Sequence, residues 1–370
     1  MRYFDYSSTS PMSEEALIAY TTCAKEYYAN PLSVHRLGVQ ADWHLNDYRH
    51  RIASQLGVKD DEIFFTGSGS EANFLAIVSL ANALSHKGTH LLTIKTEHPS
   101  ILSTYQYLKS QGFEVDYVDV DQQGCVCLTS LLSQIRKDTI ICSIGMASSE
   151  IGTLQNIDIL SEILHRHGIL FHSDCVQALG KIPIDLTQVD AASFSAHKLY
   201  APKGLGIMYV SGEHHFKPFL SHVRHEYGMR PGTVDTPAVA AFTVALEHAM
   251  IVQGKLMNRH QRFQTQLLSE LTDRVTLVGC GVQERLPFHL GLFINGWSGQ
   301  QFMLECDRIG ACIAVGSACR AGQSGPPESL RALGYSKDFA EQYVRVTFGE
   351  PTTEEDISFL INTFKTLLIR

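Results

Sequence analysis

The sequence predicts an α/β protein: a large domain with a mostly parallel seven-stranded sheet flanked by helices, and a smaller C-terminal α/β domain. Strand-like and helix-like runs alternate through roughly the first 210 residues, which is typical of a parallel sheet with helices on both faces. After about residue 260 the pattern changes to short strands and short helices. The length of 370 residues also exceeds that of most single hydrophobic cores. We therefore expect a large domain over 13–259 and a small domain formed by 1–12 and 260–370.

Apolar periodicity predicts the elements of the large domain in chain order. Two helices come first, at 14–29 and 36–56. Strands are expected at 63–66, 90–94, 114–118, 139–145 and 169–173, followed by the short runs "VDAASFS" and "LGIMYV". Helices are expected at 70–84, 99–111, 128–136 and 157–167, and a long helix at 237–273 follows. The carboxyl ends of parallel strands meet at one edge of the sheet, where functional sites collect.

Composition narrows the class of protein. The formal net charge is −8 and no Lys/Arg cluster is present, which argues against nucleic acid as a partner. No apolar run looks long enough to cross a bilayer, so we expect no membrane partner. The N-terminus, "MRYFDYSSTSP", does not resemble a signal peptide, and this favours a cytoplasmic protein.

Nine cysteines are scattered along the chain without a paired C-x-x-C unit. In a chain without a signal peptide this pattern indicates reduced thiols, not a disulfide framework. Cys125-Val126-Cys127 could supply half of a metal site, but the nearby sequence offers no second half, so we expect no metal.

A glycine-rich loop, "FFTGSGSEANF", lies between a predicted strand and a predicted helix. Its glycines let backbone N–H groups close on an anion, and the positive end of the helix favours negative charge. The pattern also fits the dinucleotide fingerprint G-x-G-x-x-A, but the acidic residue expected at the end of the next strand is poorly placed. A single phosphate is therefore favoured over NAD.

Polar side chains follow three of the predicted strands. They are Asp174 and Gln177 after "GILFHS", Ser195, His197 and Lys198 after "AASFS", and His98 after "LLTIKT". A lysine after an apolar strand is costly to bury unless it is paired or neutralised, for example as a Schiff base. A lysine for an aldehyde, a carboxylate for a pyridinium nitrogen and a glycine-rich helix start for a phosphate are what pyridoxal phosphate requires. The strand ends therefore predict a pyridoxal phosphate site.

With these motifs the sequence resembles the cysteine desulfurases, the class V aminotransferase-like branch of the fold-type I pyridoxal phosphate enzymes. The resemblance covers nearly the whole chain. Its motifs are "YFDYSSTSPMSEEAL", "NPLSVHRLG", "IFFTGSGSEANFLAI", "KTEHPSI", "SEIGTLQNI", "LFHSDCVQALGKIPIDL", "SFSAHKLYAPKGLG", "GMRPGTVDTP", "GSAC", "LRALG" and "VRVTFG".

The resemblance implies a role for each site residue. Lys198 would form the Schiff base, His98 would stack on the cofactor ring, Asp174 would pair with the pyridinium and Gln177 would contact the phenolic oxygen. The residues implied at the phosphate are Gly69, Ser70, Ser195 and His197, with Thr233 reaching it from the other subunit of a homodimer. Arg345 would bind the substrate carboxylate, with Asn30 close to it.

Cys319 is the residue that distinguishes desulfuration from other pyridoxal chemistry. It lies in "AVGSACRAGQSGPPESL", whose glycines, serines and prolines predict a loop in which a thiol stays accessible and can act as a nucleophile. Cys142 and Cys312 lie in strand-like runs, and Cys175 follows Asp174, so packing is expected for these three. The G-S-A-C context resembles the desulfurase group with an extended catalytic loop.

Three positions depart from the family pattern. Ser149 stands where much of the family has an asparagine near a cofactor oxygen, Val315 replaces a serine or threonine, and Phe74 replaces a polar residue after the phosphate loop. A serine can still donate one hydrogen bond, so Ser149 is kept as a cofactor-binding residue.

The predicted activity is removal of sulfur from L-cysteine, giving L-alanine and a persulfide on Cys319 that passes to an acceptor protein. An iron–sulfur scaffold, a tRNA-thiolation protein or a dedicated client such as quinolinate synthase are all open as acceptors. The alternatives are a selenocysteine lyase, another pyridoxal phosphate-dependent aminotransferase or lyase, and a non-catalytic scaffold. Cys319 argues against the aminotransferase, and Lys198, Asp174 and His98 argue against the scaffold.

Overall fold

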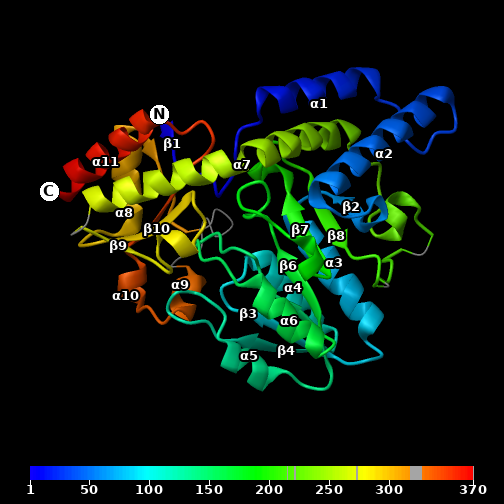
Figure 1. The fold of residues 1–370 in the computed structure, drawn as a ribbon, viewed down its shortest axis with the longest axis horizontal. Coiled ribbons are helices and arrows are strands. Elements are labelled where there is room, and N and C mark those ends of the chain that lie inside the picture. The colour runs from blue at the N-terminus through cyan, green and yellow to red at the C-terminus, as the bar shows by residue number, and fades with distance from the viewer. Residues whose placement is uncertain (215, 221, 272–273, 317–326, 370) are drawn as a thin grey trace.

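The structure is a computed structural model that describes residues 1–214, 216–220, 222–271, 274–316 and 327–369. Its largest sheet has seven strands in the order β2-β8-β7-β6-β5-β3-β4 (Figure 1). Their bounds are β2 Ile63–Thr66, β3 His90–Ile94, β4 Glu114–Val118, β5 Thr139–Ser143, β6 Leu170–Asp174, β7 Ala191–Ser195 and β8 Gly206–Val210. Only β8 runs antiparallel to its neighbours β2 and β7, so the predicted mostly parallel seven-stranded sheet is confirmed.

Helices cover both faces of this sheet because neighbouring residues on each strand point to opposite sides. Leu91 on β3 packs in a cluster with α3 (Gly69–Leu84) and α4 (Pro99–Ser110). Leu92 packs in a second cluster with α6 (Ile157–Arg166) and α5 (Leu128–Gln134). Strands β3, β5 and β7 are buried along their whole length, which explains why they appear as apolar runs in the sequence.

A second group of elements follows the long helix α7 (Thr236–Glu270). A three-stranded antiparallel sheet has the order β12-β10-β9, and β1 pairs in parallel with β11. The bounds are β1 Arg2–Tyr3, β9 Val275–Leu277, β10 His289–Ile294, α8 Gly299–Ile309, β11 Ala311–Cys312, α9 Glu328–Ala332, α10 Lys337–Ala340, β12 Tyr343–Thr347 and α11 Glu354–Leu368. The N-terminal segment therefore joins elements from the far end of the chain.

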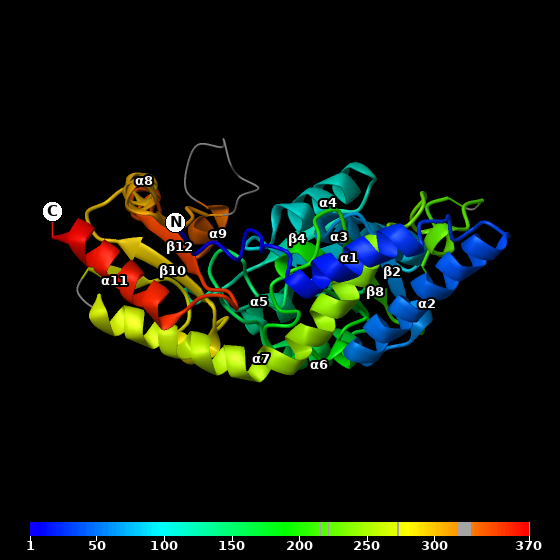
Figure 2. The same cartoon turned by 90° about the horizontal axis from the view of Figure 1, so that it is seen from above.

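Helix α7 runs past both groups of strands, and α1 (Glu14–Glu26) and α2 (Arg36–Leu56) pack against its first half (Figures 1 and 2). By length and composition it contains a window that could cross a membrane, so the expectation that no such run exists is wrong. Half of that window is buried inside the protein, as in a core helix.

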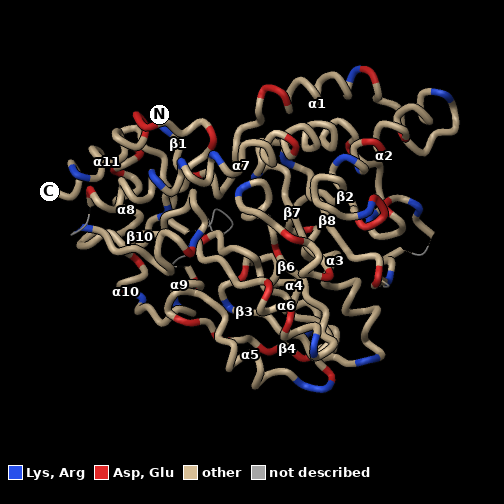
Figure 3. Tube along the Cα trace, in the orientation of Figure 1, with Lys and Arg blue, Asp and Glu red and all other residues tan. Residues whose placement is uncertain are grey.

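Figure 3 shows Lys and Arg interspersed with Asp and Glu along the described part of the chain, without a basic block.

A buried ion pair fixes the strand that leads into the glycine-rich loop. Arg49 on α2 donates from Nη2 to Glu226 Oε1 at 2.8 Å, and Glu226 Oε2 accepts the backbone N–H of Phe65 on β2 at 2.7 Å. The two ionic side chains are only 7% and 4% exposed. Removing one partner would leave the other charge buried and unpaired.

We therefore expect Arg49→Met to lower the free energy of unfolding by about 3–5 kcal/mol, measured by urea denaturation. In the matched double variant with Glu226→Gln, no carboxylate is left unpaired, and much of the loss should be recovered. Equal losses in the single and double variants would show that the pair contributes through packing alone.

Candidate active site

A cavity of about 370 Å³ lies at the carboxyl ends of β3, β5, β6 and β7, beside the N-terminus of α3. The predicted site residues that line it are Gly69, Ser70, His98, Ser149, Asp174, Gln177, Ser195, His197, Lys198 and Arg345. Residues far apart in the sequence thus meet at the predicted edge of the sheet. Their individual roles stay predictions.

The start of α3 is shaped to receive an anion. Ser68 caps the helix, accepting the N–H of Glu71 at 3.1 Å. A Cβ on Gly69 would lie 2.8 Å from Val176 Cγ2 and 3.0 Å from Ser195 Cβ, so a glycine is needed for this close approach. The hydroxyl of Ser195 is buried without a hydrogen-bond partner in the described structure. A buried hydroxyl beside a helix N-terminus fits one phosphate group.

The carboxylate of Asp174 is held in place from two sides. Its Oδ1 accepts the N–H of Val176 at 2.9 Å, and its Oδ2 accepts Asn73 Nδ2 at 2.7 Å. Asn73 was missed in the sequence, although it follows Ser70 by three residues and therefore lies on the same face of the helix. This anchoring orients an acceptor toward the cavity.

Lys198 lies on a short 3-10 turn, Ala196–Lys198, directly after β7. Its Nζ donates to the carbonyl oxygens of Ser7 and Ser8, both at 2.6 Å. His197 contacts Thr9 Oγ1 through Nδ1 at 3.0 Å. Burial and the cation of Lys198 lower the pKa of His197 to about 4, so its imidazole is neutral at pH 7.

A second lysine lies behind the first. Gln177 donates from Nε2 to the carbonyl of Ser7 at 3.0 Å, while its Oε1 accepts Lys181 Nζ at 3.3 Å. Burial and the nearby Lys198 lower the pKa of Lys181 to about 7. Lys181 follows Gln177 by four residues in the turn "QALGK". It fixes which end of the Gln177 amide faces the N-terminal segment.

His98 caps α4, and its Nδ1 accepts the N–H of Ser100 at 3.2 Å, which assigns the ring proton to Nε2. The preceding Glu97 also lines the cavity, and its Oε1 accepts the N–H of Gly145 at 2.6 Å. Burial, with a smaller contribution from the Asp174 charge, raises the pKa of Glu97 to about 8. This carboxyl group is therefore protonated at neutral pH, and it cannot serve as the ionised acid of a dinucleotide site.

Arg345 reaches the cavity from β12 and is 1% exposed. Its Nη2 donates to Asp5 Oδ1 and Ser8 Oγ, both at 2.8 Å, and its Nη1 donates to the carbonyl of Ser149 at 3.0 Å. The Nε atom has no partner in the described structure. A guanidinium held in this way can bind a small carboxylate.

Two predicted site residues lie elsewhere. Asn30 Nδ2 lies 3.5 Å from Thr233 Oγ1, and neither residue lines the cavity.

The predicted nucleophile Cys319 is outside the described residues. The residues that flank its segment are close together: a Cβ on Gly316 would lie 3.1 Å from Pro327, and Ser329 donates to the cavity residue Glu150 at 2.5 Å.

Of the three cysteines expected to pack, Cys142 and Cys175 are buried, whereas Cys312 is only partly buried. Cys175 is fully buried, and burial raises its pKa to about 12. Cys142 is also fully buried, with a raised pKa from the same cause. Among the residues that the structure describes, no group of His, Cys, Asp or Glu could hold a metal ion.

Comparison with known proteins agrees with this geometry. The family model "Aminotransferase class-V" matches residues 2–360. The chain belongs to this family. A NifS relative from Halalkalibacterium halodurans is 41% identical over 374 aligned residues, covering 100% of this chain and 99% of the relative. The cysteine desulfurase IscS of Dictyoglomus turgidum is 34% identical, and the alignment covers 99% of this chain and 94% of the relative.

A solved structure described as a NifS-like protein matches with a TM-score of 0.93 and 29% identity over the full length of both chains. The predicted family and fold are therefore confirmed. The full-length homologues also support the prediction of a cysteine desulfurase enzyme.

Proposed function

We propose that this protein is a cytoplasmic, pyridoxal phosphate-dependent cysteine desulfurase that moves the sulfur of L-cysteine to Cys319 and releases L-alanine. The observation that carries the proposal is the meeting of Lys198 and Asp174 with a phosphate-sized helix start in one cavity. Homology to cysteine desulfurases over the whole chain supports the choice of reaction.

The residues present fit the cofactor. Gly69, Ser70, Ser195 and His197 would hold its phosphate, and the unpartnered hydroxyl of Ser195 supports this assignment. The further contacts would be Asp174 to the ring nitrogen, Gln177 to the ring oxygen, Lys198 to the aldehyde, His98 over the ring, and Ser149 near a cofactor oxygen. When bound, pyridoxal phosphate withdraws electrons from the substrate Cα.

The protein side chains would then position the substrate and move its protons. Arg345 would bind the substrate carboxylate beside Ser149. The amine of Lys198, directed by the carbonyls of Ser7 and Ser8, would take the Cα proton as general base. The thiolate of Cys319 would attack the substrate sulfur, and the substrate Cβ–S bond would break with its electron pair staying on the carbon side. Protonation of that carbon gives alanine, and the persulfide stays on Cys319.

One assay distinguishes the proposal from its alternatives. With L-cysteine and a reductant, a desulfurase should release sulfide and alanine in equal amounts, whereas an aminotransferase would produce an oxo acid and a scaffold would produce nothing. A selenocysteine lyase would release selenide from selenocysteine and no sulfide from cysteine. Copurified proteins would then identify the acceptor among an iron–sulfur scaffold, a tRNA-thiolation protein and a dedicated client such as quinolinate synthase.

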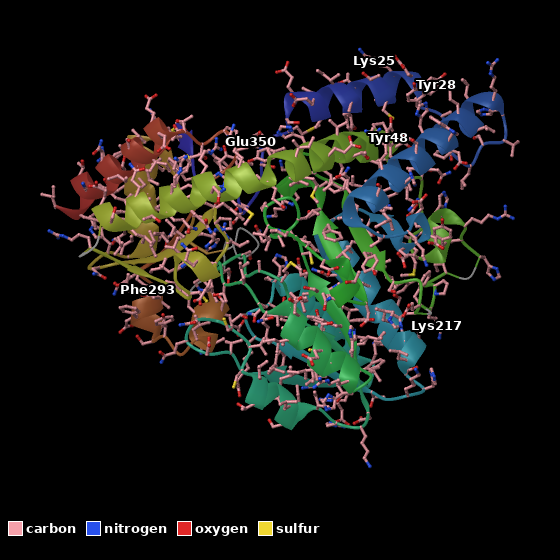
Figure 4. The ribbon with its side chains drawn as sticks, in the orientation of Figure 1. Lys25, Tyr28, Tyr48, Lys217, Phe293 and Glu350 are labelled. Carbon is pink, nitrogen blue, oxygen red and sulfur yellow. The ribbon has the colours of Figure 1, made fainter. Side chains whose placement is uncertain are left out.

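The active unit is proposed to be a homodimer. Large apolar side chains are exposed along α1, α2 and their connection. The exposed fraction is 96% for Val34 and 63% for Trp43. Tyr28 projects beyond the end of α1 (Figure 4). Apolar patches of this kind mark protein interfaces, and most homo-oligomers are two-fold symmetric. Asn30 and Thr233 lie in this region, where a partner could bring them to the other cavity.

A subunit-mixing experiment tests the shared site. We expect Thr233→Ala and Lys198→Ala homodimers to be impaired, and their heterodimer to regain about half of the wild-type activity, because one of the two composite sites is intact. The measurement is sulfide release by a heterodimer purified with two different tags. If a verified heterodimer recovers nothing, each site is built within one chain.

A further inference from the structure

Two cysteines outside the cavity form a close pair. The Sγ atoms of Cys125 and Cys280 lie 3.7 Å apart, although the residues are 155 positions apart in the sequence. Cys280 is 1% exposed, and Cys125 is partly exposed. The neighbouring Cys127 has a different partner, since its Sγ contacts Thr129 Oγ1 at 3.1 Å. Two segments distant in the sequence thus bring two thiols into contact.

The backbone around both sulfurs is held in place. The N–H of Cys125 donates to Asp121 Oδ1 at 2.9 Å, which closes a tight turn before α5. The carbonyl of Cys280 accepts Arg285 Nη1 at 2.9 Å. Because each residue is anchored, the sulfurs stay close without a rearrangement of the chain. The S–S bond of a disulfide is about 2.05 Å long, so the two sulfurs must still approach each other for the bond to form.

The two thiols differ in acidity. Hydrogen bonding from Cys125 and Thr153, together with the Arg285 cation, lowers the pKa of Cys280 to about 7. The bond to Cys280, followed by burial, raises the pKa of Cys125. The lowered pKa of Cys280 favours formation of a thiolate, the form from which thiols oxidise to a disulfide.

The pair joins three segments behind the cavity. Cys280 Sγ lies 3.9 Å from Thr153 Oγ1, and Thr153 forms a β-bridge with Arg285. Gln155 donates to the carbonyl of Gly124 at 2.8 Å. The segment 151–155 directly follows the cavity residues Ser149 and Glu150. A bond between the sulfurs would therefore tie the turn before α5 to the turn after β9, across this segment.

We propose that Cys125 and Cys280 form a reversible disulfide when the protein meets a peroxide. One sulfur of the pair, as its thiolate, attacks one peroxide oxygen, the O–O bond breaks, and a sulfenic acid and one water result. The other sulfur then displaces the hydroxyl group, which leaves as a second water, and the S–S bond forms. Both sulfurs are oxidised, hydrogen peroxide is reduced to two waters, and an external thiol restores the pair. The inference does not depend on the proposed function.

The test uses the full-length protein treated with limiting hydrogen peroxide, followed by alkylation in denaturant and peptide mapping without reductant. We expect a Cys125–Cys280 cross-linked peptide, loss of alkylation at both cysteines, and full recovery of alkylation after dithiothreitol. Cys125→Ser and Cys280→Ser should each abolish this cross-link, whereas the neighbouring control Cys127→Ser should retain it. The cross-link closes a long loop, so the oxidised wild type should also unfold at a higher temperature than the reduced form.

Three results would overturn the proposal: a disulfide between Cys125 and Cys127, one between Cys280 and Cys319, or both thiols still alkylated at a peroxide dose that oxidises Cys127. The mapping and the thermal comparison use wild-type protein, so the test stands even if a serine variant fails to fold.

Discussion

Cys319→Ala should release no sulfide from L-cysteine, a loss of roughly 10³-fold or more, because the substrate sulfur then has no thiolate to attack it. The variant should still bind the cofactor and still change its absorbance when cysteine is added, since Lys198 and Arg345 line the cavity unchanged. Sulfide assays, absorbance spectra and mass spectrometry of the persulfide together separate sulfur transfer from the earlier steps.

The matched control is Cys312→Ala. Cys312 pairs with Tyr3 on β1, does not line the cavity and has a thiol whose pKa is raised by burial. This variant should keep wild-type sulfide release. Wild-type activity in Cys319→Ala, or a persulfide mapped to Cys175 or Cys312, would contradict the assignment and favour a β-elimination mechanism.

Lys198→Ala should abolish turnover and remove the yellow absorbance of the bound cofactor. Its Nζ is the amine that the carbonyls of Ser7 and Ser8 direct at the cavity. Loss of the general base alone costs roughly 10²–10⁴-fold, and loss of the covalent link adds to this. Absorbance spectra of the purified protein, together with turnover assays, provide the measurement.

Borohydride reduction followed by peptide mapping locates the attachment site. In the wild type the pyridoxyl group should lie on Lys198 and not on Lys181, which is also close to the cavity and partly neutral at pH 7. Lys181→Met is the control, and it should keep the label on Lys198. A label on Lys181 in the wild type would refute the assignment.

Much of the fold could be predicted because six of the seven strands of the large sheet are buried on both faces and therefore appear as apolar runs, β4 being the exception. β2 and β3 have the bounds that periodicity predicts, while the strand expected at 139–145 ends at Ser143. The last two positions of that prediction belong to the connection into the cavity, where Gly145 contacts Glu97. An apolar run does not show at which residue the hydrogen-bonded strand ends and the cavity-lining connection begins.

The site residues whose side chains carry the chemistry could be predicted from the sequence. The backbone groups that contribute to the site could not. Asp174 and Lys198 stand out after apolar strands, but the carbonyls of Ser7 and Ser8 have no signature in a sequence. Asn73 could have been found from its helical spacing to Ser70, whereas Lys181 lies in a turn after Gln177 and has no such signal. The Cys125–Cys280 contact could not, because no local pattern relates residues so distant in the chain.

The N-terminal segment has a consequence for how the protein folds. Phe4 accepts the N–H of Thr347, Asp5 binds Arg345, and Ser7 holds Lys198, so residues made first depend on residues made much later. Bringing the N-terminal segment to partners so distant in the chain loses conformational entropy before the contacts that stabilise it have formed. These pairings therefore form later than the local βα units. We therefore expect a folding intermediate that has the seven-stranded sheet but no lysine pocket, and synthesis of β12 to be required before the enzyme can mature.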